Sequence, residues 1–207
     1  MPRFYQFLDL PAIPDHYLDI ALSRAATFSA LPEEQRLSQR TNPLHRPERP
    51  VLRITRNGQS RSGRTAPRTD FADILHDWVN HNISTEWNQI NVGVNLPPID
   101  GAIGDATVAH TDTTRSHVLI YLLETSNADQ ATVWYREQGQ PLHRKRNTTV
   151  EDYSKLIELE RAVFPVRTWV MLDATVIHGV ENVSDQRTAI HVGFDIDPFG
   201  VTGWAVS

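Results

Sequence analysis

The C-terminal half of the chain alternates short apolar runs with turn residues, and this pattern limits the fold more than any other feature. From residue 103 onward the runs read ATVAH, SHVLIYLLE, ATVWYRE, RTWVMLDA and TAIHVGFDI. Strands of this length and spacing favour a β-sandwich or a barrel. The 207 residues suit one domain of ordinary size, so we expect a single domain over residues 1–207.

The segment TVEDYSKLIELERAVFP carries two competing patterns. Thr148 and Glu151 have the spacing of a capping box, which favours the start of a helix. Leu159, Arg161 and Val163 alternate as in a strand that ends just before a proline. We therefore predict a short helical turn followed by a strand.

Two helices are predicted ahead of the strand-rich half. Residues 15–30 place apolar side chains at helical spacing behind Asp15, which is available as an N-cap. A second helix begins at Thr69 or Asp70, with a core-facing stripe made of Phe71, Ile74, Leu75, Trp78 and Val79. WNQINVGVNL follows as a strand. The expected fold class is thus an all-β core with flanking helices.

Residues 31–68 form an Arg-rich stretch in a chain whose net charge is −5. Prolines, arginines and the run RNGQSRSGRT break any periodicity there, so we expect a loop. Glu48 is the only acid between Arg36 and Arg68, a segment that holds nine arginines. This loop is either a solvated surface or a basic surface for phosphate and other anions, and the second interpretation makes nucleic acid a partner.

The chain has no cysteine, which excludes disulfides, thiolate metal sites, iron–sulfur clusters and cysteine nucleophiles. Any metal ion must be held by His, Asp or Glu side chains, and such a set suits Fe(II), manganese or zinc. No apolar run approaches the roughly 18 residues that a membrane span needs. The N-terminus lacks the basic flank and apolar core of a signal peptide. We expect a cytoplasmic protein with no membrane partner.

Two candidate metal ligands stand just ahead of a strand. In VAHTDTTRSHVLIYLLE, His110 and Asp112 are separated by one residue, so on an extended backbone their side chains project to the same side. A third ligand should come from another strand end, and His178 follows the buried-looking strand in RTWVMLDATVIHGVENV. Two histidines and one carboxylate leave three open positions on a metal ion, which is typical of non-haem Fe(II) oxygenases.

An arginine lies nine residues after His178. In the strand RTAIHVGFDI, Arg187 and His191 share one face, while the apolar residues between and after them share the other. If the apolar face packs outward, Arg187 points into the barrel, where an unpaired guanidinium is costly unless a carboxylate meets it. A dicarboxylic co-substrate could chelate the metal at one end and pair with Arg187 at the other.

These motifs together resemble the 2-oxoglutarate- and Fe(II)-dependent dioxygenase superfamily, of the prolyl-hydroxylase-like HxD…H…R type. GDATVAHTD is similar to the superfamily's first metal-binding motif, WVMLDATVIHGVENV surrounds the distal histidine, and the arginine of DQRTAIHVGF stands at the expected offset. The likeness covers about residues 88–197. It implies a double-stranded β-helix, a cupin-like jelly roll, with the N-terminal helices packed on the major sheet.

The resemblance also implies roles for the site residues. His110, Asp112 and His178 would bind Fe(II), and Arg187 would bind the distal carboxylate of the co-substrate 2-oxoglutarate. Members of the superfamily use O2 to convert 2-oxoglutarate into succinate and CO2 while they oxidise a second substrate. Asp112 favours hydroxylation over halogenation, because related halogenases have a small residue at this position.

Two positions depart from the superfamily's pattern. A tyrosine often stands three residues before the Gly-Asp pair, where this chain has Gly101, and the frequent Arg-x-Ser reads RTA here. Tyr121 is our candidate for the missing contact to a 2-oxoglutarate carboxylate; alternatively, it is a core residue with its hydroxyl bonded to backbone. His117 and His191 are further candidates to face the cavity.

The sequence thus predicts an Fe(II)- and 2-oxoglutarate-dependent oxygenase that hydroxylates a small molecule or a peptide or protein side chain. An oxygenase directed at nucleic acid through the Arg-rich loop 31–68 is a less favoured alternative. A non-catalytic metal-binding β-helix module is the third hypothesis.

Overall fold

The computed structural model describes residues 4–16, 18–19, 22–23, 26, 30, 70–95, 109–112, 115–125, 127–144, 148–150 and 152–199. Within these residues the strands are β1 (Tyr5–Leu8), β2 (Gln89–Asn95), β3 (His117–Glu124), β4 (Ala131–Glu137), β5 (Leu156–Ala162), β6 (Trp169–Asp173), β7 (Ile177–Glu181) and β8 (Arg187–Phe194). Helix α3 spans Asp70–Asn82, and the 3-10 turn η1 spans Tyr153–Lys155.

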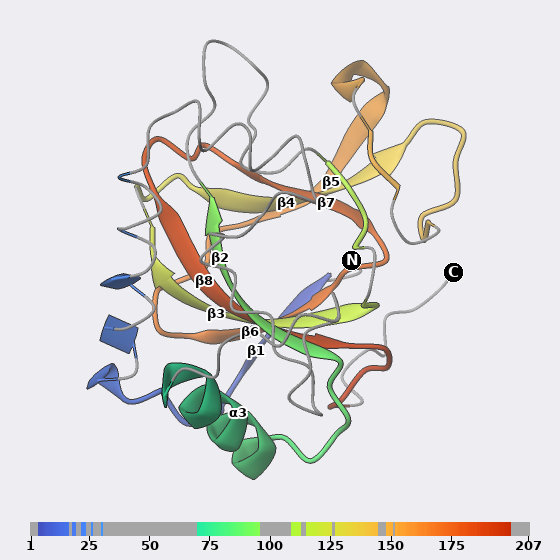
Figure 1. The fold of residues 1–207 in the computed structure, drawn as a ribbon. Coiled ribbons are helices and arrows are strands. Elements are labelled where there is room, and N and C mark those ends of the chain that lie inside the picture. The colour runs from blue at the N-terminus through green and yellow to red at the C-terminus, as the bar shows by residue number, and fades with distance from the viewer. Residues whose placement is uncertain are drawn as a thin grey trace.

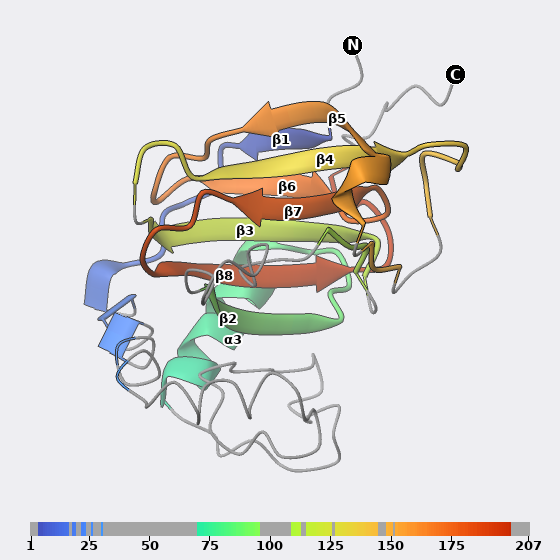
Figure 2. The ribbon, with the colours of Figure 1, turned by 90° about the horizontal axis from the view of Figure 1, so that it is seen from above.

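The strands form two sheets that face each other (Figure 1). The larger sheet has the order β1-β6-β3-β8-β2 and the smaller one has the order β5-β4-β7. All the paired neighbours are antiparallel. Figure 2 shows the strands of both sheets running along a common direction, as in aligned sandwiches. The arrangement is a jelly-roll-like β-sandwich, in agreement with the predicted all-β core.

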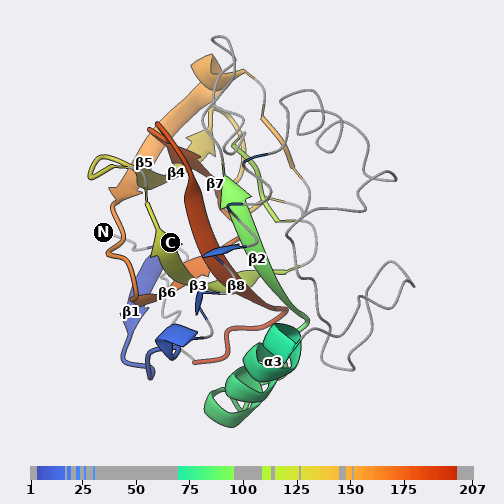
Figure 3. The same cartoon turned by 60° about the vertical axis from the view of Figure 1, so that its left-hand side comes forward.

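Helix α3 covers the outer face of the larger sheet (Figures 1 and 3). Leu75 and Val79 from the predicted apolar stripe join one buried cluster with residues of β3, β6 and β8. Trp78 stacks on Trp169 of β6 with ring centroids 5.0 Å apart. The helix begins at Asp70, as the capping pattern predicts. Among the described residues, no helix is both long and apolar enough to cross a membrane.

The helix expected over residues 15–30 is described only in part. Every described residue between 15 and 26 is helical, and Leu18 packs into the same cluster as α3. The predicted Arg-rich loop 31–68 lies outside the described residues.

The alternation of β8 decides which of its side chains face the space between the sheets. Ile190, Val192 and Phe194 belong to the cluster under α3, so they point outward. Ala189 belongs to a second cluster, which lies between the sheets and includes Trp134 of β4. Successive residues of a strand point to opposite faces. Residues 187, 189 and 191 therefore point inward, as the strand pattern predicts.

The segment after residue 148 has the predicted order of a helical turn and a strand. The turn η1 is followed directly by β5, which pairs with β4. Its N-cap is Asp152, whose carboxylate accepts a hydrogen bond from the backbone N–H of Ser154 at 3.1 Å. The turn therefore begins later than the capping-box spacing of Thr148 suggests.

Candidate metal centre

The backbone brings the two distant motifs into direct contact. The N–H of His110 donates to the carbonyl of His178, and the N–H of His178 donates to the carbonyl of His110, both at 2.9 Å. On its other side, His110 forms an antiparallel bridge with Thr149. This backbone pairing holds residue 110 in a fixed register between two segments that are far apart in sequence.

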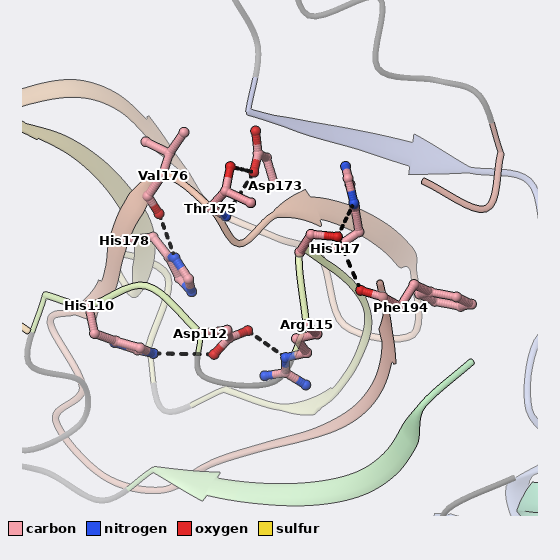
Figure 4. A network of polar contacts seen from close by, with 10 residues as sticks. His110, Asp112, Arg115, His117, Asp173, Thr175, Val176, His178 and Phe194 are labelled. Atoms are coloured by element: carbon pink, nitrogen blue, oxygen red, sulfur yellow. Dashed lines mark hydrogen bonds and ion pairs between the residues drawn. The ribbon is translucent and has the colours of Figure 1, made fainter. Parts of the chain in front are cut away.

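His110, Asp112 and His178 form the one group of His, Asp and Glu side chains that could hold a metal ion within the described ranges. Their ligand atoms all lie within 4.8 Å of one another, and Nε2 of His110 lies 3.5 Å from Oδ1 of Asp112. The two imidazole rings have centroids 4.8 Å apart. Figure 4 shows the three side chains pointing toward a common position. The predicted set therefore comes together.

His178 is set up as a neutral ligand. Its ring is buried, and Nδ1 lies 3.0 Å from the carbonyl oxygen of Val176. Because a carbonyl only accepts, Nδ1 carries the proton and Nε2 is the nitrogen available to a metal. Burial, followed by the nearby His110, lowers the pKa of His178 to about 4. The ring is therefore uncharged at neutral pH and does not have to lose a proton when it binds an ion.

Asp112 is ionised although it is only 9% exposed. Burial acts to raise the pKa of this carboxyl, but Arg115, His110 and His178 together hold the pKa well below its usual value. Arg115 contributes most to this lowering, and its Nε donates a short hydrogen bond to Oδ2 of Asp112. The sequence reasoning missed Arg115. The available signal was that Arg115 lies three residues after Asp112, a candidate metal ligand.

Asp112 and Ser116 both form backbone hydrogen bonds with one residue of the opposite segment, Ala174. The N–H of Asp112 donates to the carbonyl of Ala174 at 3.2 Å, and the N–H of Ala174 donates to the carbonyl of Ser116 at 2.8 Å. Ala174 sits in a turn in which the buried carboxylate of Asp173 accepts from the N–H and the hydroxyl of Thr175 at 2.8 and 2.6 Å. This turn therefore fixes the backbone on which the Asp112 carboxylate is carried.

Arg187 lies inside the sandwich, as predicted. It is 3% exposed, and it is on the inward face of β8 with Ala189. Burial lowers its pKa to about 10, so the guanidinium stays positively charged at neutral pH. The interior of the sandwich therefore holds a buried cation as well as the His-Asp-His cluster.

His191 lies on the same face of β8 as Arg187. It faces inward from the strand that carries Arg187, and its pKa lies well below the usual value through burial, followed by the charges of Arg115 and Arg187. The charges of Asp112 and His178 also act on this pKa. The expectation that His191 faces the cavity agrees with this position.

The structure corrects two expectations for β3. Tyr121 belongs to the cluster under α3 and packs on Trp169, with ring centroids 4.6 Å apart. It faces away from the space between the sheets, so its predicted contact with a co-substrate does not fit the geometry. The ring lies in the core, as the alternative interpretation has it, although no hydrogen bond to backbone is found for its buried hydroxyl among the described residues. His117 shares that face by alternation, and Figure 4 shows its ring pointing away from the cluster.

Sequence reasoning also missed Thr132 on β4. Trp134 and His178 are directly opposite each other in the register, as are Thr132 and Val180, and opposite residues of an antiparallel pair point to the same face. Because Trp134 lies in the cluster between the sheets, Thr132 faces the same interior, where it is buried. The strand pattern of ATVWYRE alone did not say which face is inward, since Trp134 and Tyr135 are both large and aromatic.

The cluster fits a divalent ion. Bonds of about 2.0–2.2 Å from imidazole and carboxylate ligands place two neighbouring ligand atoms about 3 Å apart. The separation of 3.5 Å between His110 and Asp112 is close to this value, and the remaining ligand atoms, all within 4.8 Å of one another, would have to move closer together around a bound ion. With no sulfur ligand, the set favours Fe(II), manganese or zinc.

No protein-family model matches the chain, and no curated protein matches its sequence. Two solved structures of the non-heme monooxygenase ThoJ, a nickel complex and an apo form, are similar at 12% and 13% identity, with TM-scores of 0.41 and 0.43. Each match covers 91% of this chain and 72% of that chain. AviO1 from Streptomyces viridochromogenes Tue57 is similar at 14% identity with a TM-score of 0.37, over 96% of this chain and 91% of that chain. At these scores the likeness assigns neither a family nor an activity.

Proposed function

We propose that this chain is a non-haem Fe(II)- and 2-oxoglutarate-dependent oxygenase with the double-stranded β-helix, or cupin-like, form of the jelly roll. The observation that carries the proposal is the pairing, in one interior, of the His110–Asp112–His178 cluster with the buried cation Arg187. A metal site alone would fit a binding module equally well. The inward arginine supplies what such a module does not need, a receptor for an anionic group between the sheets.

Each side chain of the cluster has a defined task in this proposal. His110, Asp112 and His178 hold Fe(II) and leave three positions open, and Fe(II) bound there would supply the redox chemistry. His178 offers Nε2 because Nδ1 is engaged by the carbonyl of Val176. Asp112 contributes the negative charge, which Arg115 keeps ionised. The overall reaction would convert 2-oxoglutarate, O2 and a substrate C–H bond into succinate, CO2 and a C–OH group.

Arg187 would bind the distal carboxylate of 2-oxoglutarate. A guanidinium pairs with a carboxylate through two parallel hydrogen bonds, and these are stronger in a buried site. Thr132, which faces the same interior, is our candidate for the additional contact that Tyr121 cannot make. Its hydroxyl can donate to a carboxylate oxygen.

The substrate in this proposal is a small molecule or a peptide or protein side chain, and the outcome is hydroxylation. The retained carboxylate of Asp112 supports that outcome, because it fills the position that a halide would need. No contact among the described residues supports a nucleic-acid substrate, and that alternative rests only on the composition of residues 31–68.

The test is anaerobic loading of the full chain with Fe(II) and 2-oxoglutarate, followed by O2 and measurement of succinate with a panel of candidate substrates. We expect succinate from the wild type and none from His178→Ala, whereas His117→Ala, the neighbouring histidine that points away, keeps the activity. Arg187→Ala should weaken 2-oxoglutarate binding without loss of Fe(II), and Arg187→Lys should lie between it and the wild type, because lysine lacks the planar fork.

Fe(II) binding without any consumption of 2-oxoglutarate by the wild type would favour the non-catalytic module. An oligonucleotide interaction that weakens steeply with salt would favour a nucleic-acid substrate instead. Unchanged affinity for 2-oxoglutarate in Arg187→Ala would mean that this arginine has been given the wrong role.

A further inference from the structure

We propose that Arg115 is a positioning residue that holds the Asp112 carboxylate so that only one of its oxygens, Oδ1, is presented to the metal. The inference rests on the proposed metal-binding role of the cluster. It adds a residue that does not itself touch the ion and that decides how one ligand binds.

The two oxygens of the Asp112 carboxylate have different neighbours. Oδ2 of Asp112 accepts the short hydrogen bond from Nε of Arg115. Oδ1 lies 3.5 Å from Nε2 of His110, on the side of the cluster (Figure 4). A carboxylate that is free to turn can offer one oxygen or both to an ion. The contact with Arg115 removes that choice.

The backbone next to Arg115 is held in place by hydrogen bonds. The next residue, Ser116, donates its N–H to the carbonyl of Phe194 at 2.9 Å and accepts from the N–H of Ala174 at 2.8 Å. The side chains of Arg115 and Asp112 are each only 12% exposed, so water screens their attraction weakly. A charge-assisted hydrogen bond between two anchored and largely buried groups fixes orientation well.

Arg115 can affect metal binding through its charge and through the orientation that it gives to the Asp112 carboxylate. The positive charge of Arg115 repels a divalent ion, which weakens metal binding, but it also keeps the Asp112 carboxylate ionised, which strengthens it. Holding the carboxylate in the binding orientation strengthens metal binding, because the ligand need not be ordered when the ion arrives. Lysine at position 115 keeps the charge but cannot hold the carboxylate in the same way. A substitution that keeps the charge but loses the planar guanidinium therefore distinguishes them.

The experiment titrates the metal-free full chain with Co²⁺ alone and follows the visible absorption of the bound ion, whose position and intensity depend on coordination number. The variants are Arg115→Lys, which keeps the charge, and Arg115→Gln, which removes it. Arg144→Gln is the matched control, because the side chain of Arg144 pairs with Glu137 at 2.6 Å in another largely buried contact, with both side chains 20% exposed, and it does not contact Asp112. Thermal unfolding of each metal-free variant checks the fold, and Arg115→Lys keeps the test available if Arg115→Gln does not fold.

We expect both Arg115 variants to bind Co²⁺ about 10–100-fold more weakly, which is the usual effect of removing the partner of a metal ligand. Their absorption bands should differ from the wild-type band, while Arg144→Gln matches the wild type in affinity and spectrum. Wild-type affinity and spectrum in Arg115→Lys, with either tighter or weaker binding by Arg115→Gln, would overturn the inference, because Arg115 would then act only through its charge. Wild-type affinity and spectrum in both variants would also overturn it while leaving the metal site intact. A wild-type chain that does not bind Co²⁺ would overturn the metal site and this inference together.

Discussion

Replacing Gly93 by alanine tests the position that the structure gives to His191. Strands β2 and β8 pair so that Gly93 is opposite Ala189, two residues before His191 on β8. A Cβ atom on residue 93 would lie 2.7 Å from Cε1 and 3.0 Å from Nδ1 of the His191 ring. Carbon atoms pack best at about 3.5–4.0 Å. The ring or the strand must therefore move by about 1 Å.

The cost of this movement should be that of overpacking, about 1–3 kcal/mol of unfolding free energy. Strand β2 is at the edge of the larger sheet and can yield, which favours the lower part of this range. If the His191 ring is the obstacle, Gly93→Ala should cost much less in a chain that already carries His191→Ala. The coupling energy between the two substitutions should then approach the whole cost of Gly93→Ala.

The assay is urea unfolding of the metal-free wild type, the two single variants and the double variant at pH 7. Independent substitutions add within about 0.3–0.5 kcal/mol. Additive effects of Gly93→Ala and His191→Ala would therefore refute the placement of the His191 ring over residue 93. They would also contradict the position of the His191 side chain on the inward face of β8.

Three further predictions follow from the packing and the site. Burial holds the pKa of His178 at about 4 in the folded chain, against about 6.5 when unfolded, so this group's contribution to stability is complete above about pH 6.5 and is lost toward pH 4. Between these pH values the unfolding free energy should fall by about 3 kcal/mol through His178. In urea unfolding of the metal-free chain, His178→Asn should lack this part of the pH dependence. An unchanged pH dependence in His178→Asn would contradict the prediction. Thr132→Val should weaken 2-oxoglutarate binding by about 1.5–3 kcal/mol, the value of a hydrogen bond to a charged group, whereas Tyr121→Phe should leave it unchanged in the same calorimetric titration. Leu75→Ala, at the contact between α3 and the sheet, should lower the unfolding free energy by about 2–5 kcal/mol, and a loss below about 1 kcal/mol would mean that α3 does not pack there.

The sequence predicted those parts of the site that depend on strand alternation and on the spacing of ligands. The inward direction of Arg187 could be derived because three apolar residues on the other face of β8 needed a core. The meeting of His110 with His178 followed from two strand ends that each carried a metal-ligating residue. In both cases the prediction needed only the residue pattern within single strands or short motifs.

The wrong expectation for Tyr121 shows where such reasoning stops. Alternation places Tyr121 on the same face of β3 as His117 and Leu119, but it could not say which face of β3 is inward. In the structure Tyr121 is opposite Ile190, so both residues face α3. The answer therefore lies in the pairing between β3 and β8, which periodicity within one strand does not contain.

The contact between Arg115 and Asp112 was missed for a related reason. The two residues lie in a connection rather than a strand, so no alternation rule orients their side chains. Hydrogen bonds to Ala174, more than fifty residues later in the chain, set the backbone there. Only the folded arrangement brings Nε of Arg115 to Oδ2 of Asp112.

The most direct test of the account is a crystal structure of the full chain loaded anaerobically with Fe(II), with an anomalous difference map recorded at the iron edge. We predict one strong peak, at about 2.0–2.2 Å from Nε2 of His110, Oδ1 of Asp112 and Nε2 of His178. A map with no peak at this position, or with iron bound at another group of side chains, would contradict the claim that these three residues form the metal centre.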